Sequence, residues 1–439
     1  MKNLTLVIIT LTLLFNSCQQ KEPWIDLIGD NLDNWEQLNG NAEYKIVDGT
    51  IEGSTVLRSP NSFLCTKDHF TDFILEFDVL VDPEMNSGVQ IRSNSLPDYL
   101  NGTVHGYQVE IDPSERAWSG GIYDESRRMW LYPLDRNPEG KEAFIDGAFN
   151  HFRVEAIGNS IRIWCNGIPC SDLIDDMTDS GFIGLQVHSI GNDSSRLGKK
   201  VIWKNIRIIK DEVASYVTPY SKDIPQNSYL VNSLSEREKQ EGWRLLFDGS
   251  TSDGWRSVNS DMFPEEGWLI EDGKFVRNEA GGDIITTDVF TDFELIIDFK
   301  YEHGSNSGIK YFVSGDMGND PAYNLGCEYQ IIDRRAYDDL PGKERIAGVY
   351  DLIEPVSPRD NGPGIWNRAR VVVNGQNVQH WLNNQMTVEY VRGTEKWREL
   401  VSNSKFNDVP GFGEHAEGHI LLQDHGAKVS FRSIKIKEL

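Results

Sequence analysis

The sequence predicts an all-β protein built from two tandem antiparallel β-sandwich domains. The first observation is an internal repeat: Phe-Thr-Asp-Phe at 70–73 recurs at 290–293, and Asn-Ser-Gly at 86–88 recurs at 306–308, both at an offset of 220 positions. A period of this length indicates two whole domains, since each half can bury its own core. The second observation is that short apolar runs separated by Gly, Asn and Asp fill most of each half, which is typical of strands and turns. The sequence shows no alternating βαβ pattern.

The two copies show the same order of predicted strands. In each copy a long apolar strand precedes a hairpin with a turn of Gly and Asn, and a further strand closes the copy. These segments are 73–79, 154–164 and 201–208 in the first copy, and 293–299, 370–382 and 429–436 in the second. We therefore place the first sandwich domain at 24–210 and the second at 235–439.

The segment between the copies, 211–234, has the polar, Pro-containing composition of a linker. Ser235 followed by Glu238 is a capping-box pattern, in which each side chain bonds the backbone N–H of the other residue. The pattern predicts a short helix that ends near Gly242.

Residues 1–18 are expected to be an export signal. Lys2 supplies a short positive region, and the apolar run at 4–15 is too short to anchor the chain across a bilayer. The run ends in a small residue and Cys18, which resembles a bacterial lipoprotein signal and implies that Cys18 becomes the lipidated first residue of the mature chain. An ordinary secretory signal that contains a Cys is the alternative. We expect an exported outer-membrane lipoprotein, periplasmic or on the cell surface, held to the membrane only by its lipid.

The composition argues against nucleic acid as a partner. Acidic residues outnumber basic ones by 68 to 43, and the formal net charge is −25, whereas nucleic-acid binding needs a basic face. The chain also contains 12 Trp, 15 Tyr and 19 Phe, and aromatic faces suit sugar rings.

Two of the cysteines are close in sequence. Cys165 and Cys170 flank a predicted hairpin turn, where an exported protein could form a disulfide. The second copy has Leu382 and Thr387 near those positions, so two free buried thiols are the alternative.

Both copies contain a set of motifs in a fixed order. In the second copy they are GWRLLFDGSTSDGW (242–255), NSGIKYFV (306–313), GCEYQIID (326–333), AGVYDLIEP (347–355), HWLNN (380–384), GHILLQDHG (418–426) and FRSIKIKEL (431–439). This set resembles the 3-keto-disaccharide hydrolase domain family over nearly all of 235–439. The first copy is similar to another branch of the family through NSGVQIRS (86–93), GYQVEID (106–112), SGGIYDESRRMWLYPL (119–134) and GFIGLQVH (181–188). The resemblance implies two concanavalin-like jelly-roll domains that cleave glycosides oxidised to a ketone at C3.

Such a substrate allows chemistry other than the paired-carboxylate route of ordinary glycosidases. The ketone acidifies the hydrogen on C2, so a base can remove it and the resulting enolate can expel the group on C1. Water addition then gives net hydrolysis, and without it the enzyme is a lyase. The site needs a base, a group that stabilises the enolate, and an acid for the leaving oxygen.

The second copy holds residue types that fit these roles. Strand alternation places Glu328 and Gln330 on one face. His425 shares a face with Gln423 and has a pKa range suited to a base or an acid, and Lys310 could stabilise the enolate. We predict that His425, Glu328 and Lys310 are catalytic and that Gln330, Gln423, Asp333 and Tyr350 bind substrate, with Asp351 and His380 as second-rank candidates.

The first copy differs at these positions. Gln108 and Glu110 stand in exchanged order relative to the second copy, and Gln90 replaces Lys310. Residues 123–130 add two arginines and an aromatic residue, which suits either ligand contact or a solvated loop. We expect substrate contacts from Arg92, Gln108, Glu110, Gln186 and His188. The site either survives with altered specificity or keeps only its sugar-binding part.

Simpler interpretations remain for several motifs. Asn-Ser-Gly is typical of a tight turn, and Gln-x-His could be a hydrogen-bonded structural pair. No metal or other cofactor is predicted. The expected partner is an oxidised oligosaccharide or glycoside. A glycan-binding lipoprotein without catalysis is the alternative function, since such sandwich folds often only hold glycans.

Overall fold

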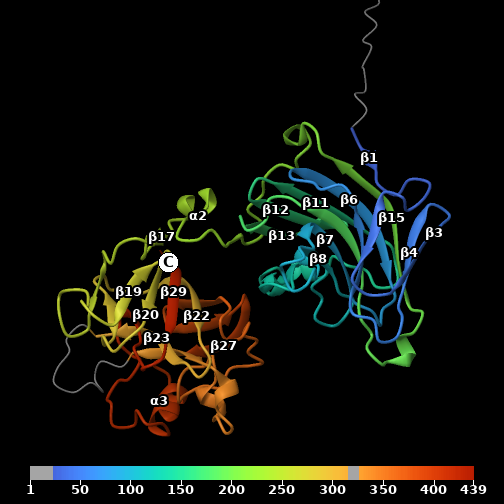
Figure 1. The fold of residues 1–439 in the computed structure, drawn as a ribbon. Helices are drawn as coiled ribbons and strands as arrows, with labels where there is room; N and C mark the ends of the chain where they lie inside the picture. Colours follow the sequence, from blue (N-terminus) through green and yellow to red (C-terminus); the bar gives the residue numbers. More distant parts are fainter. Residues whose placement is uncertain (1–22, 315–325) are drawn as a thin grey trace, which may run out of the picture.

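A computed structural model describes residues 23–314 and 326–439 (Figure 1). Two β-sandwich domains follow each other, the first coloured blue to green and the second yellow to red (Figure 1). The all-β tandem prediction is therefore confirmed. Cys18 and the predicted signal lie outside the described residues. No helix in the described part of the chain has the length and apolar character needed to cross a membrane.

The first domain consists of two sheets whose neighbouring strands are hydrogen-bonded. The nine-stranded sheet runs β16 (Asn227–Ser228), β13 (Ile168–Ile174), β12 (Ser160–Cys165), β11 (Asn150–Ile157), β6 (Phe73–Val81), β15 (Lys200–Ile209), β4 (Thr50–Ser54) and β3 (Glu43–Val47), with β1 (Ile25–Asp26) beside β15. The seven-stranded sheet runs β10 (Met129–Tyr132), β9 (Ile122–Glu125), β8 (His105–Ile111), β7 (Ser87–Asn94), β14 (Phe182–Val187), β5 (Ser62–Thr66) and β2 (Trp35–Leu38).

The second domain repeats this arrangement with fewer strands. Its eight-stranded sheet runs β19 (Trp268–Glu271), β20 (Lys274–Arg277), β29 (Val429–Glu438), β22 (Phe293–Tyr301), β25 (Asn367–Asn374), β26 (Asn377–Leu382) and β27 (Gln385–Val391), with β17 (Arg244–Leu245) beside β29. Its five-stranded sheet runs β18 (Trp255–Ser257), β21 (Ile284–Thr286), β28 (His419–Leu422), β23 (Asn306–Val313) and β24 (Cys327–Ile332).

Helices are short and few in the described residues. The α-helices are α1 (Pro138–Lys141), α2 (Glu236–Gln240) and α3 (Glu395–Ser402), and the 3-10 helices are η1 (Leu134–Arg136), η2 (Ser194–Arg196), η3 (Val213–Ser215), η5 (Arg334–Ala336) and η6 (Gly342–Glu344). The predicted capping box is present at α2: the Ser235 hydroxyl accepts from the Glu238 N–H at 3.1 Å, and the Glu238 carboxylate accepts from the Ser235 N–H at 2.8 Å.

Each domain buries a main apolar core between its two sheets. In the second domain Tyr329 and Ile331 of β24 belong to this core, together with apolar residues of β22. In the first domain Val109 and Ile111 of β8 do the same. Because side chains alternate along a strand, the polar residues between them lie on the outer face of the smaller sheet. This alternation places both candidate sites.

The predicted linker packs between the domains. β16 pairs in parallel with β13 of the first domain, with Leu173 opposite Asn227. On the other side, Arg368 of β25 donates a hydrogen bond to the Ser228 carbonyl at 2.7 Å and lies 3.7 Å from the centre of the Tyr229 ring. The segment therefore contacts both sandwiches, through a ladder on one side and a cation–π contact on the other.

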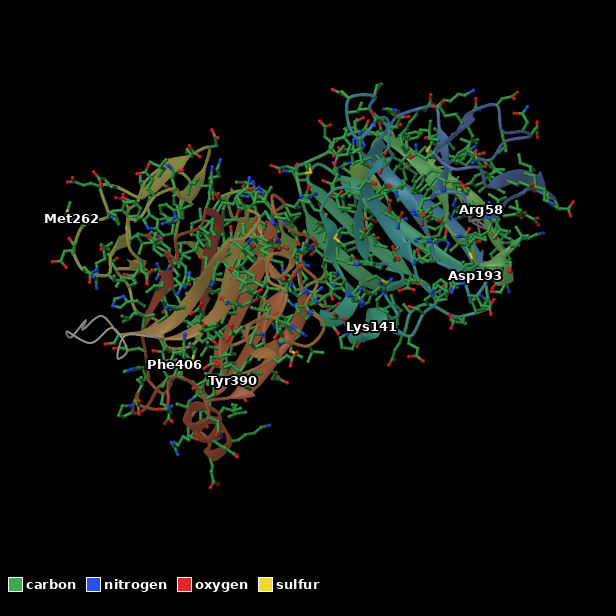
Figure 2. All side chains as sticks on the ribbon, turned by 60° about the horizontal axis from the view of Figure 1, so that its bottom comes forward. Arg58, Lys141, Asp193, Met262, Tyr390 and Phe406 are labelled. Atoms are coloured by element: carbon green, nitrogen blue, oxygen red, sulfur yellow. The ribbon has the colours of Figure 1, made fainter. Side chains whose placement is uncertain are left out.

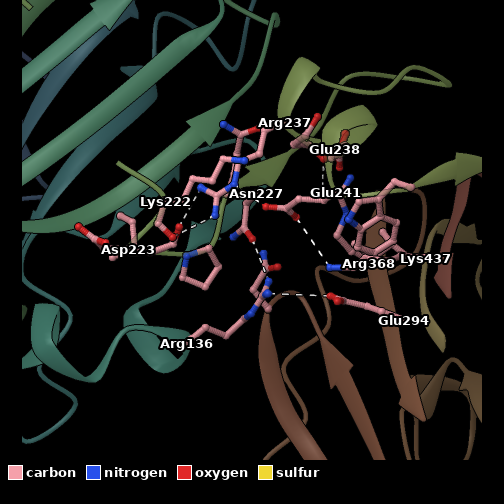
Figure 3. Close-up of a pocket in the computed structure, with 17 residues that line it drawn as sticks. Arg136, Lys222, Asp223, Asn227, Arg237, Glu238, Glu241, Glu294, Arg368 and Lys437 are labelled. Carbon is pink, nitrogen blue, oxygen red and sulfur yellow. Dashed lines mark hydrogen bonds and ion pairs between the residues drawn. The ribbon is translucent and has the colours of Figure 1, made fainter. Parts of the chain in front are cut away.

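A cavity of about 260 Å³ lies at this junction (Figure 3). Arg136 of the first domain points toward Glu294 of β22, with 3.9 Å between Nη2 and Oε1. Nearby, the Asn384 amide donates to the Leu131 carbonyl of β10 at 3.0 Å. These contacts tie strand β10 and the 3-10 helix η1 of the first domain to the second domain.

Cys165 and Cys170 are both free and buried, in β12 and β13. Burial raises the pKa of the Cys170 thiol to about 12, so this thiol stays protonated and unreactive at neutral pH. Of the two alternatives, the structure has free thiols rather than a disulfide.

Candidate active site

A cavity of about 160 Å³ lies on the outer face of the five-stranded sheet of the second domain. Strands β23 and β24, the segment after β28, and loops from elsewhere in the domain contribute to it. Its lining residues are Asn306, Lys310, Gly326, Glu328, Gln330, Tyr350, Lys405, Phe406, Gln423 and His425. The structure thus brings together six of the residues predicted for this domain: His425, Glu328, Lys310, Gln330, Gln423 and Tyr350.

Lys310 and Glu328 form the base of this cavity. They are opposite each other in the β23–β24 ladder, with 3.7 Å between Nζ and Oε2, and both are at least 90 % buried. Burial raises the pKa of the Glu328 carboxyl, and this effect outweighs the opposing attraction of the positive charges of Lys310, Lys405 and His425. A carboxylate with a raised pKa is a stronger base when ionised, as proton abstraction from carbon requires.

Asn-Ser-Gly is not a turn, which corrects the simpler interpretation of this motif. Residues 306–308 open strand β23, and the three residues have separate functions. Asn306 lines the cavity, and Ser307 donates a hydrogen bond to the Gln423 carbonyl at 2.8 Å. A Cβ on Gly308 would lie 2.4 Å from Oε1 of Glu328, so glycine leaves the space that this carboxylate occupies.

Gln423 and His425 follow β28 and approach the cavity from the opposite side. Gln423 N–H continues the ladder by donating to the Gly308 carbonyl at 3.0 Å. Asp424, between them, points away: it accepts from the N–H groups of Gly281 and Gly282, both at 2.9 Å. This anchoring holds Gln423 and His425 toward the cavity. Oε1 of Gln423 is buried and has no hydrogen-bond partner among the described residues, so it is free to accept from a substrate hydroxyl.

Lys405 and Phe406 are cavity residues that the sequence did not indicate. They follow helix α3, and Figure 2 shows Phe406 on the second domain. The Lys405 N–H donates to the Asp351 carboxylate at 2.7 Å, and its ammonium lies 4.0 Å from the centre of the Tyr350 ring. Lys405 therefore adds a second positive charge to the one supplied by Lys310.

Asp333 and Arg92 were predicted to contact substrate, and the structure corrects both expectations. Asp333 is fully buried outside the cavity, where its carboxylate caps η5 by accepting from the Arg335 N–H at 3.1 Å and also accepts from the Gly304 N–H at 3.0 Å. The Arg92 guanidinium is also buried, and it donates to the carbonyls of Thr71 and Gly158, both at 2.7 Å. Both side chains are committed to holding loops in place.

Of the second-rank candidates for base or acid, Tyr350 lines the cavity, whereas Asp351 and His380 lie outside its lining. His380 is buried in the core, with 2.7 Å between Nε2 and the Tyr311 hydroxyl, and burial lowers its pKa to about 4. Asp351 forms an ion pair with Lys343 at 2.6 Å. Neither is placed to contact a sugar in the cavity.

The first domain has a cavity of about 440 Å³ at the corresponding place on its seven-stranded sheet. Of the residues predicted there, Gln108, Glu110, Gln186 and His188 line it. The other lining residues are Asn61, Asn86, Asp112, Ser114, Arg116, Tyr123, Glu125, Met129 and Trp130. In the described residues no group of three or more His, Cys, Asp and Glu side chains is close enough to hold a metal ion.

Both domains match the family model of the 3-keto-alpha-glucoside-1,2-lyase-like domain, over residues 23–209 and 242–437. The chain belongs to this family. A relative named 3-keto-disaccharide hydrolase, from Bacteroides thetaiotaomicron, is 36 % identical over 252 residues, which are 50 % of this chain and 86 % of the relative. The resemblance inferred from the motifs is confirmed.

Solved structures give further matches to this chain. A crystal structure of a candidate glycosyl hydrolase from Parabacteroides distasonis is 32 % identical, with a TM-score of 0.44 over 48 % of this chain and 99 % of that one. A second candidate glycosyl hydrolase from the same organism is 25 % identical, with a TM-score of 0.35 over 45 % of this chain and 99 % of that one.

The two 3-keto-alpha-glucoside-1,2-lyase-like domains differ at the base of their cavities. In the first domain Gln90 is opposite Gln108 in the β7–β8 ladder, as Lys310 is opposite Glu328 in β23–β24. The Gln90 amide donates to Oε1 of Gln108 at 2.7 Å, so a neutral amide pair replaces the ion pair. Glu110 is opposite Gly88 where Gln330 is opposite Gly308, and the predicted exchange of Glu and Gln is confirmed.

Two acidic residues of the first cavity, Glu110 and Glu125, have raised pKa values. Burial raises the pKa of Glu110 to about 7, against the effect of hydrogen bonds from Asn86 at 2.6 Å and Gln108 at 3.0 Å. Burial also raises the pKa of Glu125 to about 7. Near neutral pH these carboxyls exchange protons readily and can both donate and accept hydrogen bonds.

Proposed function

We propose that the second domain cleaves 3-keto-glycosides by removing the C2 proton and expelling the group on C1. Family membership makes the chain a carbohydrate-active hydrolase or lyase of 3-keto sugars. The observation that carries the finer proposal is the buried Lys310–Glu328 pair, with His425 in the same cavity. The arrangement offers a base, positive charge and a proton donor around one small volume.

In the proposed reaction the Glu328 carboxylate takes the C2 proton. The electron pair of the C–H bond moves toward the ketone, and the enolate oxygen is stabilised by the ammonium groups of Lys310 and Lys405. The enolate then reforms the C3 ketone, a C1=C2 double bond forms, and the C1–O bond breaks. His425 protonates the leaving oxygen, and its exposed position allows it to regain a proton from solvent. Water addition across the double bond completes hydrolysis.

Substrate hydroxyls are proposed to bond the amides of Gln330 and Gln423. Gln330 is nearly fully buried beside Glu328, and Gln423 has the unpartnered Oε1 described above. Asn306 and Tyr350 complete the polar wall. Orienting the sugar in this way aligns the C2–H bond with the base, and alignment alone can lower a barrier by several kcal/mol, roughly 7 to 11 in the best cases.

The test uses a 3-keto-glucoside with a 4-nitrophenyl aglycone beside the unoxidised glucoside, each incubated with the purified mature protein. Aglycone release from the keto form alone is the expected result. Mass spectrometry of the sugar product separates hydrolase from lyase, since the lyase product lacks one water. No release from either compound would overturn the proposed elimination and favour a protein that only binds glycans.

We further propose that residues 1–18 direct export and that Cys18 carries the lipid. The support is the order of Lys2, the apolar run at 4–15 and the small residue before Cys18. Membrane fractionation of cells producing the full chain should find the protein in the envelope fraction. The substitution Cys18→Ala should release it, and retention of this variant in the membrane would contradict lipidation.

A further inference from the structure

Gln186 in the first domain is a buried amide without a partner. Its residue exposure is 1 %, it lines the first cavity, and neither Oε1 nor Nε2 has a hydrogen-bond partner among the described residues. Leaving such a group unpaired in the interior is unfavourable. A ligand hydroxyl, which both donates and accepts, would satisfy both atoms of this amide.

An aromatic wall stands on the same cavity. Tyr123 and Trp130 both line it, and their ring centres are 5.0 Å apart. Trp130 also contacts Trp118, with ring centres 4.5 Å apart, and the Arg116 guanidinium, which lines the same cavity and lies 4.9 Å from its ring centre. A fixed aromatic face beside polar groups suits the apolar C–H face of a sugar ring.

The second domain supports this wall. The backbone of β10, which carries Trp130, accepts hydrogen bonds from two side chains of the second domain. Asn384 donates to the Leu131 carbonyl at 3.0 Å, and Asn361 donates to the Arg128 carbonyl just before the strand at 3.2 Å. The cavity is therefore shaped in the two-domain chain and is best studied there.

The charges of this cavity suit an uncharged ligand. Among the described residues no lysine lines it, and the Arg116 guanidinium is already paired with Asp112 at 2.7 Å and lies 3.6 Å from Glu110. An anionic sugar would therefore meet carboxyl groups without a free cation. The cavity also lacks the ammonium groups that Lys310 and Lys405 supply to the second cavity, so the enolate of a 3-keto sugar would not be stabilised.

We propose that the first-domain cavity binds an intact neutral saccharide and does not cleave it. The inference goes beyond the proposed elimination, because it requires no ketone. The volume of about 440 Å³ lies within the range of small-molecule sites, about 300–1,000 Å³, and exceeds the 160 Å³ of the second cavity. The first domain would hold a glycan chain while the second acts on an oxidised unit.

Isothermal titration calorimetry of the full mature chain tests this proposal. The probes are four unoxidised disaccharides: trehalose, maltose, cellobiose and gentiobiose. At least one should bind without release of a monosaccharide, and Gln186→Leu should weaken that binding about tenfold or more, since it removes both hydrogen-bonding atoms at similar volume. The matched variant Gln423→Leu changes the equivalent amide of the second domain and should leave this binding unchanged.

Three results would overturn the proposal: no binding of any of the four sugars, equal affinity of Gln186→Leu and the parent chain, or loss of binding in Gln423→Leu alone. If thermal unfolding shows that Gln186→Leu does not fold, Trp130→Phe replaces it, because this variant keeps an aromatic ring but shortens the wall. The readout uses unoxidised sugars, so its failure is distinguishable from failure of the 3-keto-glucoside assay.

Discussion

The ammonium group of Lys310 lies 3.7 Å from a carboxylate oxygen of Glu328, across neighbouring strands of the smaller sheet. The same ladder position in the first domain holds an amide pair, Gln90 and Gln108. The same fold thus places a charged pair at the floor of the cavity in the second domain and a neutral pair at the floor of the cavity in the first. Only the charged version combines a base with a group that stabilises negative charge on oxygen, and we expect elimination from the second domain alone.

Lys310→Met should lower kcat/KM on a 3-keto-glucoside about 100-fold or more, because it removes positive charge next to the enolate. The loss of this charge should also raise the pKa of Glu328 further, since the charge of Lys310 lowers this pKa more than any other group that opposes the effect of burial. The acidic limb of the pH–rate profile, which reports protonation of the Glu328 base, should therefore move to higher pH.

Lys396→Met is the control for this prediction, because it removes an exposed lysine from helix α3 of the same domain. Its kcat/KM and pH profile should match those of the parent chain. Equal loss of activity in the two variants would point to bulk charge and not to the Lys310–Glu328 pair.

His425→Ala should lower kcat about 100-fold or more on a substrate with a poor leaving group, the usual contribution of general acid–base catalysis. The loss should be smaller with 4-nitrophenolate, which leaves without protonation. His415→Ala, at another exposed position, should be unaffected in both assays. Unchanged turnover of His425→Ala with both leaving groups would refute its role as the acid.

Gly308→Ala should remove most of the turnover of 3-keto-glucosides while the domain stays folded. The new methyl group would lie 2.4 Å from Oε1 of Glu328 and force this carboxylate out of its position, and displacement of a catalytic group by about 1 Å can cost about 100-fold. Gly88→Ala places a methyl group 2.3 Å from Cδ of Gln108 in the first domain.

The Gly88→Ala variant should turn over 3-keto-glucosides like the parent chain, provided that circular dichroism shows both variants folded. Equal kcat/KM in Gly308→Ala and the parent would mean that Glu328 does not act from its observed position.

Alternation explains why much of the site could be predicted. The period of two along β24 places Glu328 and Gln330 on one face, and the internal repeat drew attention to Gln423 and His425. The same rule failed for Arg92, which has a φ of +46° where the register of β7 with β8 shifts, so its side chain leaves the expected face. A bulge of this kind has no signature in the residue types around it.

Two other features required three-dimensional information. Lys405 reaches the cavity from a segment after α3 that is far from the site in sequence and packs against Tyr350 and Asp351. Asn-Ser-Gly has the composition of a turn, yet Gly308 is needed because a side chain of the next strand crosses it. Such a cross-strand requirement depends on register, which composition does not encode.

Glu110 should make the first domain less stable as the pH rises. Its pKa is raised from 4.5 to about 7 in the folded chain, mainly by burial and to a smaller extent by repulsion from Asp112, against hydrogen bonds from Asn86 and Gln108 and attraction by Arg116. Between these two pKa values the folded state holds a proton that the unfolded state releases, so the free energy of unfolding falls with pH across this window, by roughly 3 kcal/mol in total.

Glu110→Gln should remove that part of the pH dependence, and it installs the residue type that Gln330 supplies in the second domain. The variant should therefore lose less stability than the parent chain between pH 5 and pH 7.5. Differential scanning calorimetry at the two pH values measures this difference, with Glu43→Gln at an exposed position of strand β3 as the control.

If Glu110→Gln and the parent lose stability equally between pH 5 and 7.5, Glu110 is already ionised in the fold and the first cavity is negatively charged. A neutral saccharide would then be bonded by a carboxylate that only accepts hydrogen bonds.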